Sequence, residues 1–127
     1  MRSILIAATA LAVIATPALA ADDVMAGLYG NTVIVSGGMV ETHSHYRADK
    51  TFDVSASFMG SDYKYSGTWE IKGDQICRTF VGGMPPNTTN PNCSPLAALA
   101  GHKVGETWDV TTPKGDKRTL TAKAGVQ

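Results

Sequence analysis

Two histidines and a glutamate occupy alternate positions in one short segment of the chain. Glu41, His43 and His45 are each separated by one residue, so in a β-strand their side chains project from the same face. The two imidazoles would then lie about 6 to 7 Å apart along the strand, a spacing from which both can bind one ion. The pattern predicts either a metal site or a polar site for a small molecule.

A metal site needs at least one further ligand near the two histidines. Glu41 continues the row, and His102 is the only other histidine in the sequence. Imidazole and carboxylate groups are common ligands of Zn²⁺. One hypothesis is therefore a divalent metal, with Zn²⁺ as the example, held by His43, His45 and either Glu41 or His102.

The same row also suits acid–base chemistry without a metal. One histidine would act as base, the other or Glu41 as acid, and Arg78 would stabilise an oxyanion. Such a set would serve an isomerase, lyase or hydrolase acting on a small molecule. The alternative is structural: the histidines are hydrogen-bonded core residues or partly solvated, because an unpartnered buried polar group costs a few kcal/mol.

The row belongs to the first strand of a predicted hairpin. A two-residue turn at Asp49-Lys50 would pair His45 with Val54 and His43 with Ala56. These apolar partners would then share a face with the histidines. On this register the sequence predicts that the Glu-His-His row points into the interior of the fold.

A second hairpin places one arginine. A two-residue turn at Gly73-Asp74 would pair Ile71 with Ile76 and Trp69 with Arg78. Trp69 and Ile71 are expected in the core, so Arg78 should point inward as well. A slip of one residue would instead place Arg78 on the surface.

Aromatic side chains on these strands are candidates for contact with a bound molecule. Core packing or closure of a barrel end is the first expectation for the two tryptophans, and stacking on a ligand is the alternative. The candidate ligand-binding residues are Phe58, Tyr63, Tyr65, Trp69 and Trp108.

The remaining segments predict an all-β fold. Further strands are expected at 31–35, 103–111 and 118–123, a turn at Ser61-Asp62, and a loop at 82–93. One short helix is expected at 94–101, with Ser94 as its cap, Pro95 at its first position and Gly101 after its end. About seven or eight strands joined by short turns indicate an antiparallel up-and-down β-barrel, with a β-sandwich as the alternative.

The N-terminal segment predicts export. Arg2, an apolar stretch and the small residues of Ala18-Leu19-Ala20 are typical of a signal peptide at 1–20, cut after Ala20. An uncleaved membrane anchor is the alternative. We therefore expect a single domain at 21–127 in the periplasm or outside the cell. In such a compartment Cys77 and Cys93 are expected to form a disulfide, rather than free thiols or a metal site.

The charge balance bears on the class of partner. The chain has 11 basic and 11 acidic residues, and loss of Arg2 with the leader leaves the remainder slightly acidic. This balance argues against nucleic acid and against an anionic membrane as partners. After cleavage of the leader, no association with a membrane is expected.

Two segments resemble known proteins. Tyr46-Arg47-Ala48-Asp49-Lys50-Thr51-Phe52 and Gly67-Thr68-Trp69 with the following strand to Cys77 are similar to small exported bacterial proteins of an uncharacterised family. In these proteins a Y-x-x-D-G-T hairpin precedes a G-T-W strand, and Lys50 stands at the usual glycine. The combination also resembles the calycin group, lipocalins and avidins. That resemblance implies a barrel whose lumen holds a small ligand, and no residue role transfers with it.

Three functions follow from these observations. The first is an exported barrel that binds a small, partly apolar molecule, with His43 and His45 as polar contacts. The second is a small enzyme using the same residues. The third is a structural or inhibitory module that binds another protein.

Overall fold

The structure, a computed structural model, describes residues 24–127, and the expected signal peptide lies outside them. In this part of the chain, no helix is long and apolar enough to cross a membrane. The elements are short 3-10 turns and strands, in the order η1 (Ala26–Leu28), β1 (Thr32–Ser36), β2 (Glu41–Tyr46), β3 (Thr51–Phe58), β4 (Ser61–Lys72), β5 (Gln75–Val81), β6 (Asn92–Pro95), η2 (Leu96–Ala98), β7 (Thr107–Thr111) and β8 (Lys117–Lys123).

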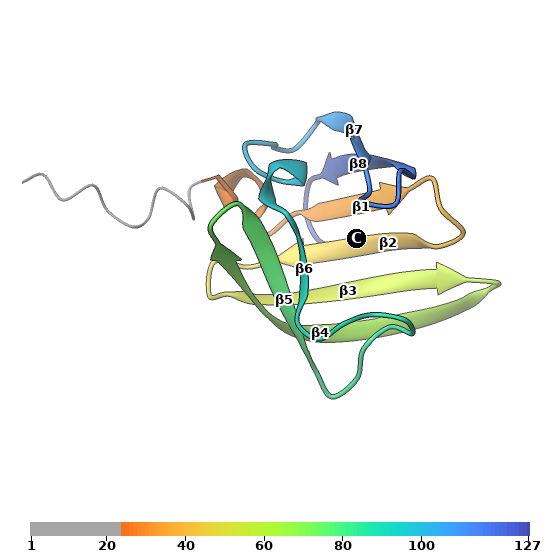
Figure 1. Cartoon of the computed structure of the whole chain (residues 1–127). Helices are drawn as coiled ribbons and strands as arrows, with labels where there is room; N and C mark the ends of the chain where they lie inside the picture. Colours follow the sequence, from red (N-terminus) through yellow and green to blue (C-terminus); the bar gives the residue numbers. More distant parts are fainter. Residues whose placement is uncertain (1–23) are drawn as a thin grey trace, which may run out of the picture.

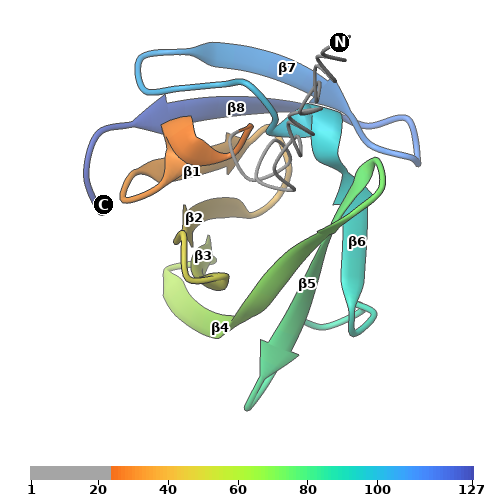
Figure 2. The same ribbon diagram turned by 90° about the vertical axis from the view of Figure 1, so that its left-hand side faces the viewer.

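All these strands form one antiparallel sheet in the order β6-β5-β4-β3-β2-β1-β8-β7. Strands β1 to β6 are neighbours in chain order, whereas β8 returns to pair with β1 and carries β7 at its far side. Figure 1 shows β1 to β4 side by side, and Figure 2 shows the sheet curling around, with β7 and β8 facing β5 and β6. The predicted all-β up-and-down fold is confirmed as a half-barrel with edges β6 and β7.

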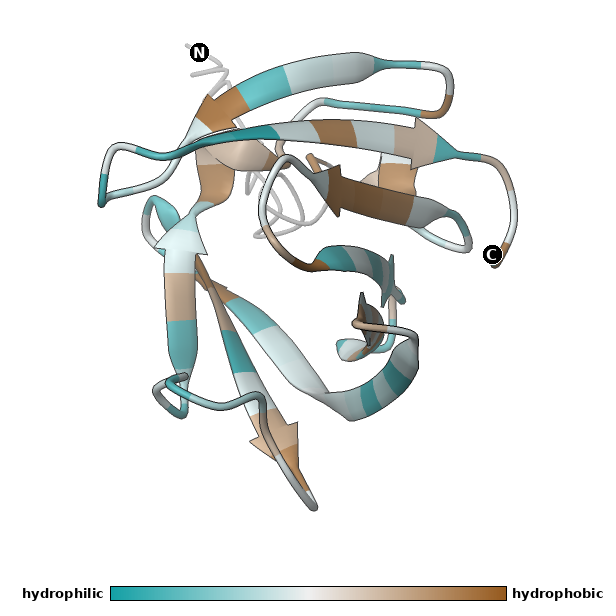
Figure 3. Ribbon diagram, turned by 90° about the vertical axis from the view of Figure 1, so that its right-hand side faces the viewer, coloured by the Kyte–Doolittle hydropathy of each residue, from teal (hydrophilic) through white to brown (hydrophobic). Residues whose placement is uncertain are grey.

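The core lies on the concave side of the curled sheet. Hydrophobic and hydrophilic positions alternate along the strands (Figure 3), as expected where one face of a sheet is buried. Four buried aromatic side chains contact one another there: the ring of Phe80 meets that of Phe52 at 5.4 Å, and Trp69 meets Tyr46 at 6.1 Å. Edge-to-face ring contacts of this kind stabilise beyond the area that they bury.

One glycine allows β4 and β5 to pack closely at this cluster. Gly67 pairs with Phe52 on one side and Phe80 on the other. A Cβ atom at Gly67 would lie 1.8 Å from the carbonyl oxygen of Thr79, so no other residue fits this backbone. Because Gly67 has no side chain, the rings of Phe52 and Phe80 meet on the concave face at this point.

The second hairpin has the register expected from the sequence. Trp69 pairs with Arg78 and Ile71 with Ile76, so the prediction that Arg78 points inward is confirmed. The turn between β3 and β4 differs from the expectation. It lies at Met59-Gly60, where both residues have positive φ, and Ser61 already belongs to β4.

The segment after the long loop is extended rather than helical at its start. Ser94 and Pro95, expected to begin a helix, belong to β6, which pairs with β5. Cys93 lies opposite Cys77 in this pairing and is disulfide-bonded to it, as predicted. The strand pairing and the disulfide hold residues 92–95 extended, so only the 3-10 turn η2 remains of the expected helix.

Candidate functional site

The hairpin of β2 and β3 turns through three residues, not two. The amide of Arg47 donates to the carbonyl of Thr51 at 3.0 Å, and that of Lys50 donates to the carbonyl of Arg47 at 3.1 Å. Lys50 has a φ of 69°, so the loop is a type I turn closed by a left-handed residue. The carboxylate of Asp49 accepts hydrogen bonds from the amide and hydroxyl of Thr51. The third residue of the loop therefore has the left-handed conformation that glycine adopts most easily.

The additional loop residue shifts the register by one. His45 pairs with Asp53, whereas a two-residue turn would have paired it with Val54. Because a one-residue shift exchanges the faces of a strand, Glu41, His43 and His45 lie on the convex face. The prediction that this row points into the interior is wrong. The concave face of β2 instead carries Thr42, Ser44 and Tyr46.

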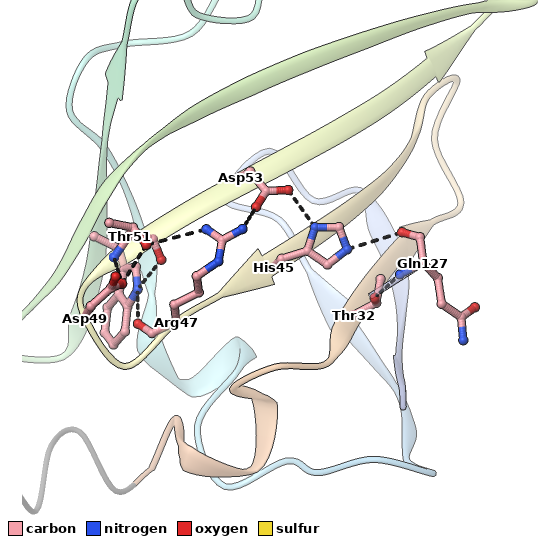
Figure 4. Close-up of polar contacts among 8 residues, drawn as sticks. Thr32, His45, Arg47, Asp49, Thr51, Asp53 and Gln127 are labelled. Carbon is pink, nitrogen blue, oxygen red and sulfur yellow. Dashed lines mark hydrogen bonds and ion pairs between the residues drawn. The ribbon is translucent and has the colours of Figure 1, made fainter. Parts of the chain in front are cut away.

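His45 is the centre of a hydrogen-bond network on the convex face (Figure 4). Its side chain is nearly buried. Nδ1 forms a hydrogen bond with Oδ2 of Asp53 at 2.7 Å, and Nε2 lies 3.2 Å from the main-chain oxygen of Gln127. Arg47 forms an ion pair with the other oxygen of Asp53. Thr32 accepts the amide hydrogen of Gln127. Both ring nitrogens of His45 thus bind the protein itself, as expected of a structural histidine.

The residues of the zinc hypothesis are not brought to one point. His43 donates to Glu41 at 2.9 Å. His102 donates to Glu106 at 2.7 Å, and its ring stacks on Trp108 with the centroids 3.7 Å apart. Within residues 24–127, no group of three His, Cys, Asp or Glu side chains is placed to hold a metal ion. The HxH spacing therefore serves contacts within the protein on this face.

The ionisation of Asp53 makes the contribution of this network to stability depend on pH. Burial raises the pKa of the Asp53 carboxyl, but hydrogen bonds from His45 and Arg47, with their charges, lower it by more. Its pKa is therefore held below the ordinary value of 3.8. A carboxyl whose pKa is lowered in the folded state stabilises the fold above its unfolded pKa, and this contribution disappears as the pH falls through its folded pKa.

We expect Asp53→Asn to lower the free energy of unfolding at neutral pH and to flatten its decline in acid. Urea unfolding between about pH 5 and pH 2 would measure this decline. Asp74→Asn, which removes an exposed carboxylate from the turn between β4 and β5, controls for the lost charge. An acid decline in Asp53→Asn as steep as in the wild type would contradict the role of this network.

A cavity of about 570 Å³ lies against the concave face. Side chains from both halves of the curled sheet surround it, together with residues from η2 and from the turn between β7 and β8. Its wall is mainly apolar, with contributions that include Val33, Val35, Val54, Phe80, Val110 and Leu120. Polar side chains also line it, and they are those of Thr42, Ser44, Tyr46, Arg78, Asn92, Ser94, Thr111, Thr112 and Arg118. A mainly apolar wall with polar groups that orient the ligand is typical of small-molecule sites.

Arg78 is the polar residue of the predicted site that does reach this cavity. Its Nε donates to the hydroxyl of Tyr46 at 2.8 Å, and one terminal nitrogen donates to Oγ of Ser94 at 3.2 Å. These bonds join β5 to β2 across the concave face and to β6 at the edge. They fix the guanidinium in place while it is only partly exposed to solvent.

The five aromatic residues expected to contact a ligand are not among the described residues that line the cavity. Trp69 is buried in the core. Trp108 packs on His102, and its indole N–H donates to the carbonyl of Ala98 at 2.8 Å. Tyr65 packs on Phe80. The remaining two lie near the turn between β3 and β4, and are Phe58 and Tyr63.

Sequence reasoning missed Tyr46, Ser44 and Arg118 as cavity residues. A signal for the first two was present. Tyr46 and Phe52 are the large aromatic side chains that flank the turn between β2 and β3. A register that pairs them places both in the core. The structure has this pairing. Arg118 had no comparable signal, because its strand was predicted without a partner.

Comparison of the chain with protein-family models, with curated proteins and with solved structures gives no match. The features of the molecule that bear on its function are therefore the cavity, its lining and its charges.

Proposed function

We propose that this protein binds a small, partly apolar molecule in the concavity of its half-barrel. The observation that carries the proposal is the cavity of about 570 Å³ with a mainly apolar wall. Small-molecule sites in proteins usually have volumes of about 300 to 1,000 Å³ and a few polar groups that orient the ligand. Here the polar groups include those of Ser44, Tyr46 and Arg78.

The hydrogen-bond network of His45 lies on the convex face, and this position favours binding over catalysis as the proposed function. Acid–base chemistry by His43 and His45 on a molecule in this cavity would need at least one of the two rings to face it. They lie on the opposite side of β2 from the cavity. The disulfide of Cys77 and Cys93 supports placing this binding protein in an oxidising compartment, the periplasm or the cell exterior.

A substitution that fills the cavity tests the proposal. The uncharged fluorophore N-phenylnaphthylamine should bind the wild type saturably with a rise in emission, since it moves from water to an apolar site. Ser44→Phe places a ring in the cavity and should weaken this binding at least about tenfold, which corresponds to the loss of about 1.4 kcal/mol. Fluorescence titration measures both affinities.

The matched control is Thr79→Phe, which adds a ring at an exposed position of β5. It should bind the fluorophore as the wild type does. Equal binding by Ser44→Phe and the wild type would contradict the proposal, as would an absence of saturable binding by the wild type.

A further inference from the structure

The charges that face the cavity all have one sign. Among the described residues that line it, two are arginines, Arg78 and Arg118, and none is aspartate or glutamate. An apolar wall with cations and no acidic partner is expected to attract an anion, because low-dielectric surroundings strengthen the attraction and no internal carboxylate competes.

The two arginines differ in how far nearby groups of the protein compensate their positive charge. A terminal nitrogen of Arg118 lies 3.9 Å from a carboxylate oxygen of Asp116, and the other donates to the carbonyl of Lys117. Arg78 has no acidic side chain within ion-pair distance in the range 24–127; its hydrogen bonds are to neutral hydroxyls. The charge of Arg78 is thus the less compensated of the two.

The geometry of Arg78 leaves a defined part of the guanidinium for a ligand. Of its five N–H donors, one bonds the hydroxyl of Tyr46 and one bonds Oγ of Ser94. The remaining donors are on the two terminal nitrogens. Two such donors side by side match the two oxygens of a carboxylate. The Tyr46 hydroxyl accepts from Arg78, so its own hydrogen is available to the same anion.

We propose that the ligand of the cavity is an amphipathic carboxylate whose head group binds Arg78 and Tyr46 and whose apolar body lies along the valines and leucine of β1, β3, β7 and β8. This inference depends on the proposed function, because it names the chemical class of the molecule that the half-barrel binds. Arg78 is the residue that selects the anion, and Arg118 adds positive potential on the other side of the cavity.

Three probes with the same apolar body and different head groups test the proposal. Isothermal titration of the disulfide-bonded protein with octanoate, octanol and octylammonium compares an anion, a neutral group and a cation. Octanoate should bind at least about tenfold more tightly than octanol, which is the effect of a charge-assisted hydrogen-bond pair. Octylammonium should bind more weakly than octanol.

Variants test whether Arg78 causes the preference for octanoate over octanol. Arg78→Met keeps the length of the side chain and should abolish the preference for octanoate over octanol. Lys123→Gln removes a positive charge from an exposed position of β8 and should leave all three affinities unchanged. Tyr46→Phe should weaken the binding of octanoate more than that of octanol. The wild-type comparison of the three probes decides the matter even if Arg78→Met does not fold.

The outcomes separate this inference from the proposed function. Octanoate and octanol binding with equal affinity would overturn the anion preference and leave the cavity as a neutral binding site. A preference for octanoate that survives in Arg78→Met would overturn the role of Arg78. An absence of binding by all three probes would contradict both the inference and the proposed function.

Discussion

Trp69→Ala is expected to lower the free energy of unfolding by about 3 to 5 kcal/mol, the range for truncating a large buried aromatic residue. Trp69 is 2% exposed. Its indole N–H donates to the carbonyls of Arg47 and Thr51, both at 3.1 Å, and Lys50 lies 4.3 Å above the ring. The substitution would therefore open a cavity in the core and release the turn between β2 and β3. Urea unfolding at pH 7 measures the loss.

The second tryptophan supplies the control for Trp69→Ala. Trp108 is only partly buried and packs at the β7 edge against His102. Trp108→Ala should cost clearly less than Trp69→Ala, because less apolar area returns to water. Equal losses for the two variants would contradict the assignment of Trp69 to the centre of the core.

Removal of the disulfide is the second large effect. Cys77 and Cys93 are 16 residues apart, and the loss of loop-closure entropy in the unfolded chain corresponds to about 3 kcal/mol. The double variant Cys77→Ala/Cys93→Ala should lose about this much stability in urea unfolding. It should also bind octanoate more weakly, because β6 carries Ser94, which holds Arg78 in place.

A reductant provides the control for the disulfide. It should destabilise the wild type to the level of the double variant and leave the double variant unchanged. A double variant as stable as the oxidised wild type would show that the pairing of β6 with β5 needs no covalent support.

Turn chemistry decided which parts of the fold could be predicted from the sequence. At Gly73-Asp74 a two-residue loop was the correct assumption, so the register of Trp69 and Arg78 followed from counting. At Asp49-Lys50 the same assumption fails, because Lys50 adopts a positive φ of 69° that its residue type does not announce. One additional loop residue then moved every side chain of β2 to the other face.

The polarity of β2 explains why the pattern did not correct this error. The concave face of the strand carries Thr42, Ser44 and Tyr46, and the convex face carries Glu41, His43 and His45. Only Tyr46 is clearly apolar, so hydrophobic alternation hardly distinguishes the two registers. The aromatic pair of Tyr46 with Phe52 is the contact that selects the observed register.

The expected helix at 94–101 failed for a different reason. Ser94, Pro95 and Gly101 are good local signals for helix ends, and Gly101 does adopt a positive φ of 77°. The pairing of β6 with β5 and the disulfide at Cys93 are long-range constraints. They override the local preference over the first residues, as tertiary contacts commonly do.

The position of the bound molecule is the most direct test of this account. An amide NMR titration of the isotope-labelled protein with octanoate would report which face of the sheet the ligand contacts. We expect shifts at concave positions such as Ser44, Arg78 and Val110, and little change at His45 and Asp53. Shifts centred on His45 and Asp53, with the concave positions unaffected, would contradict the central claim and return the HxH segment to the site.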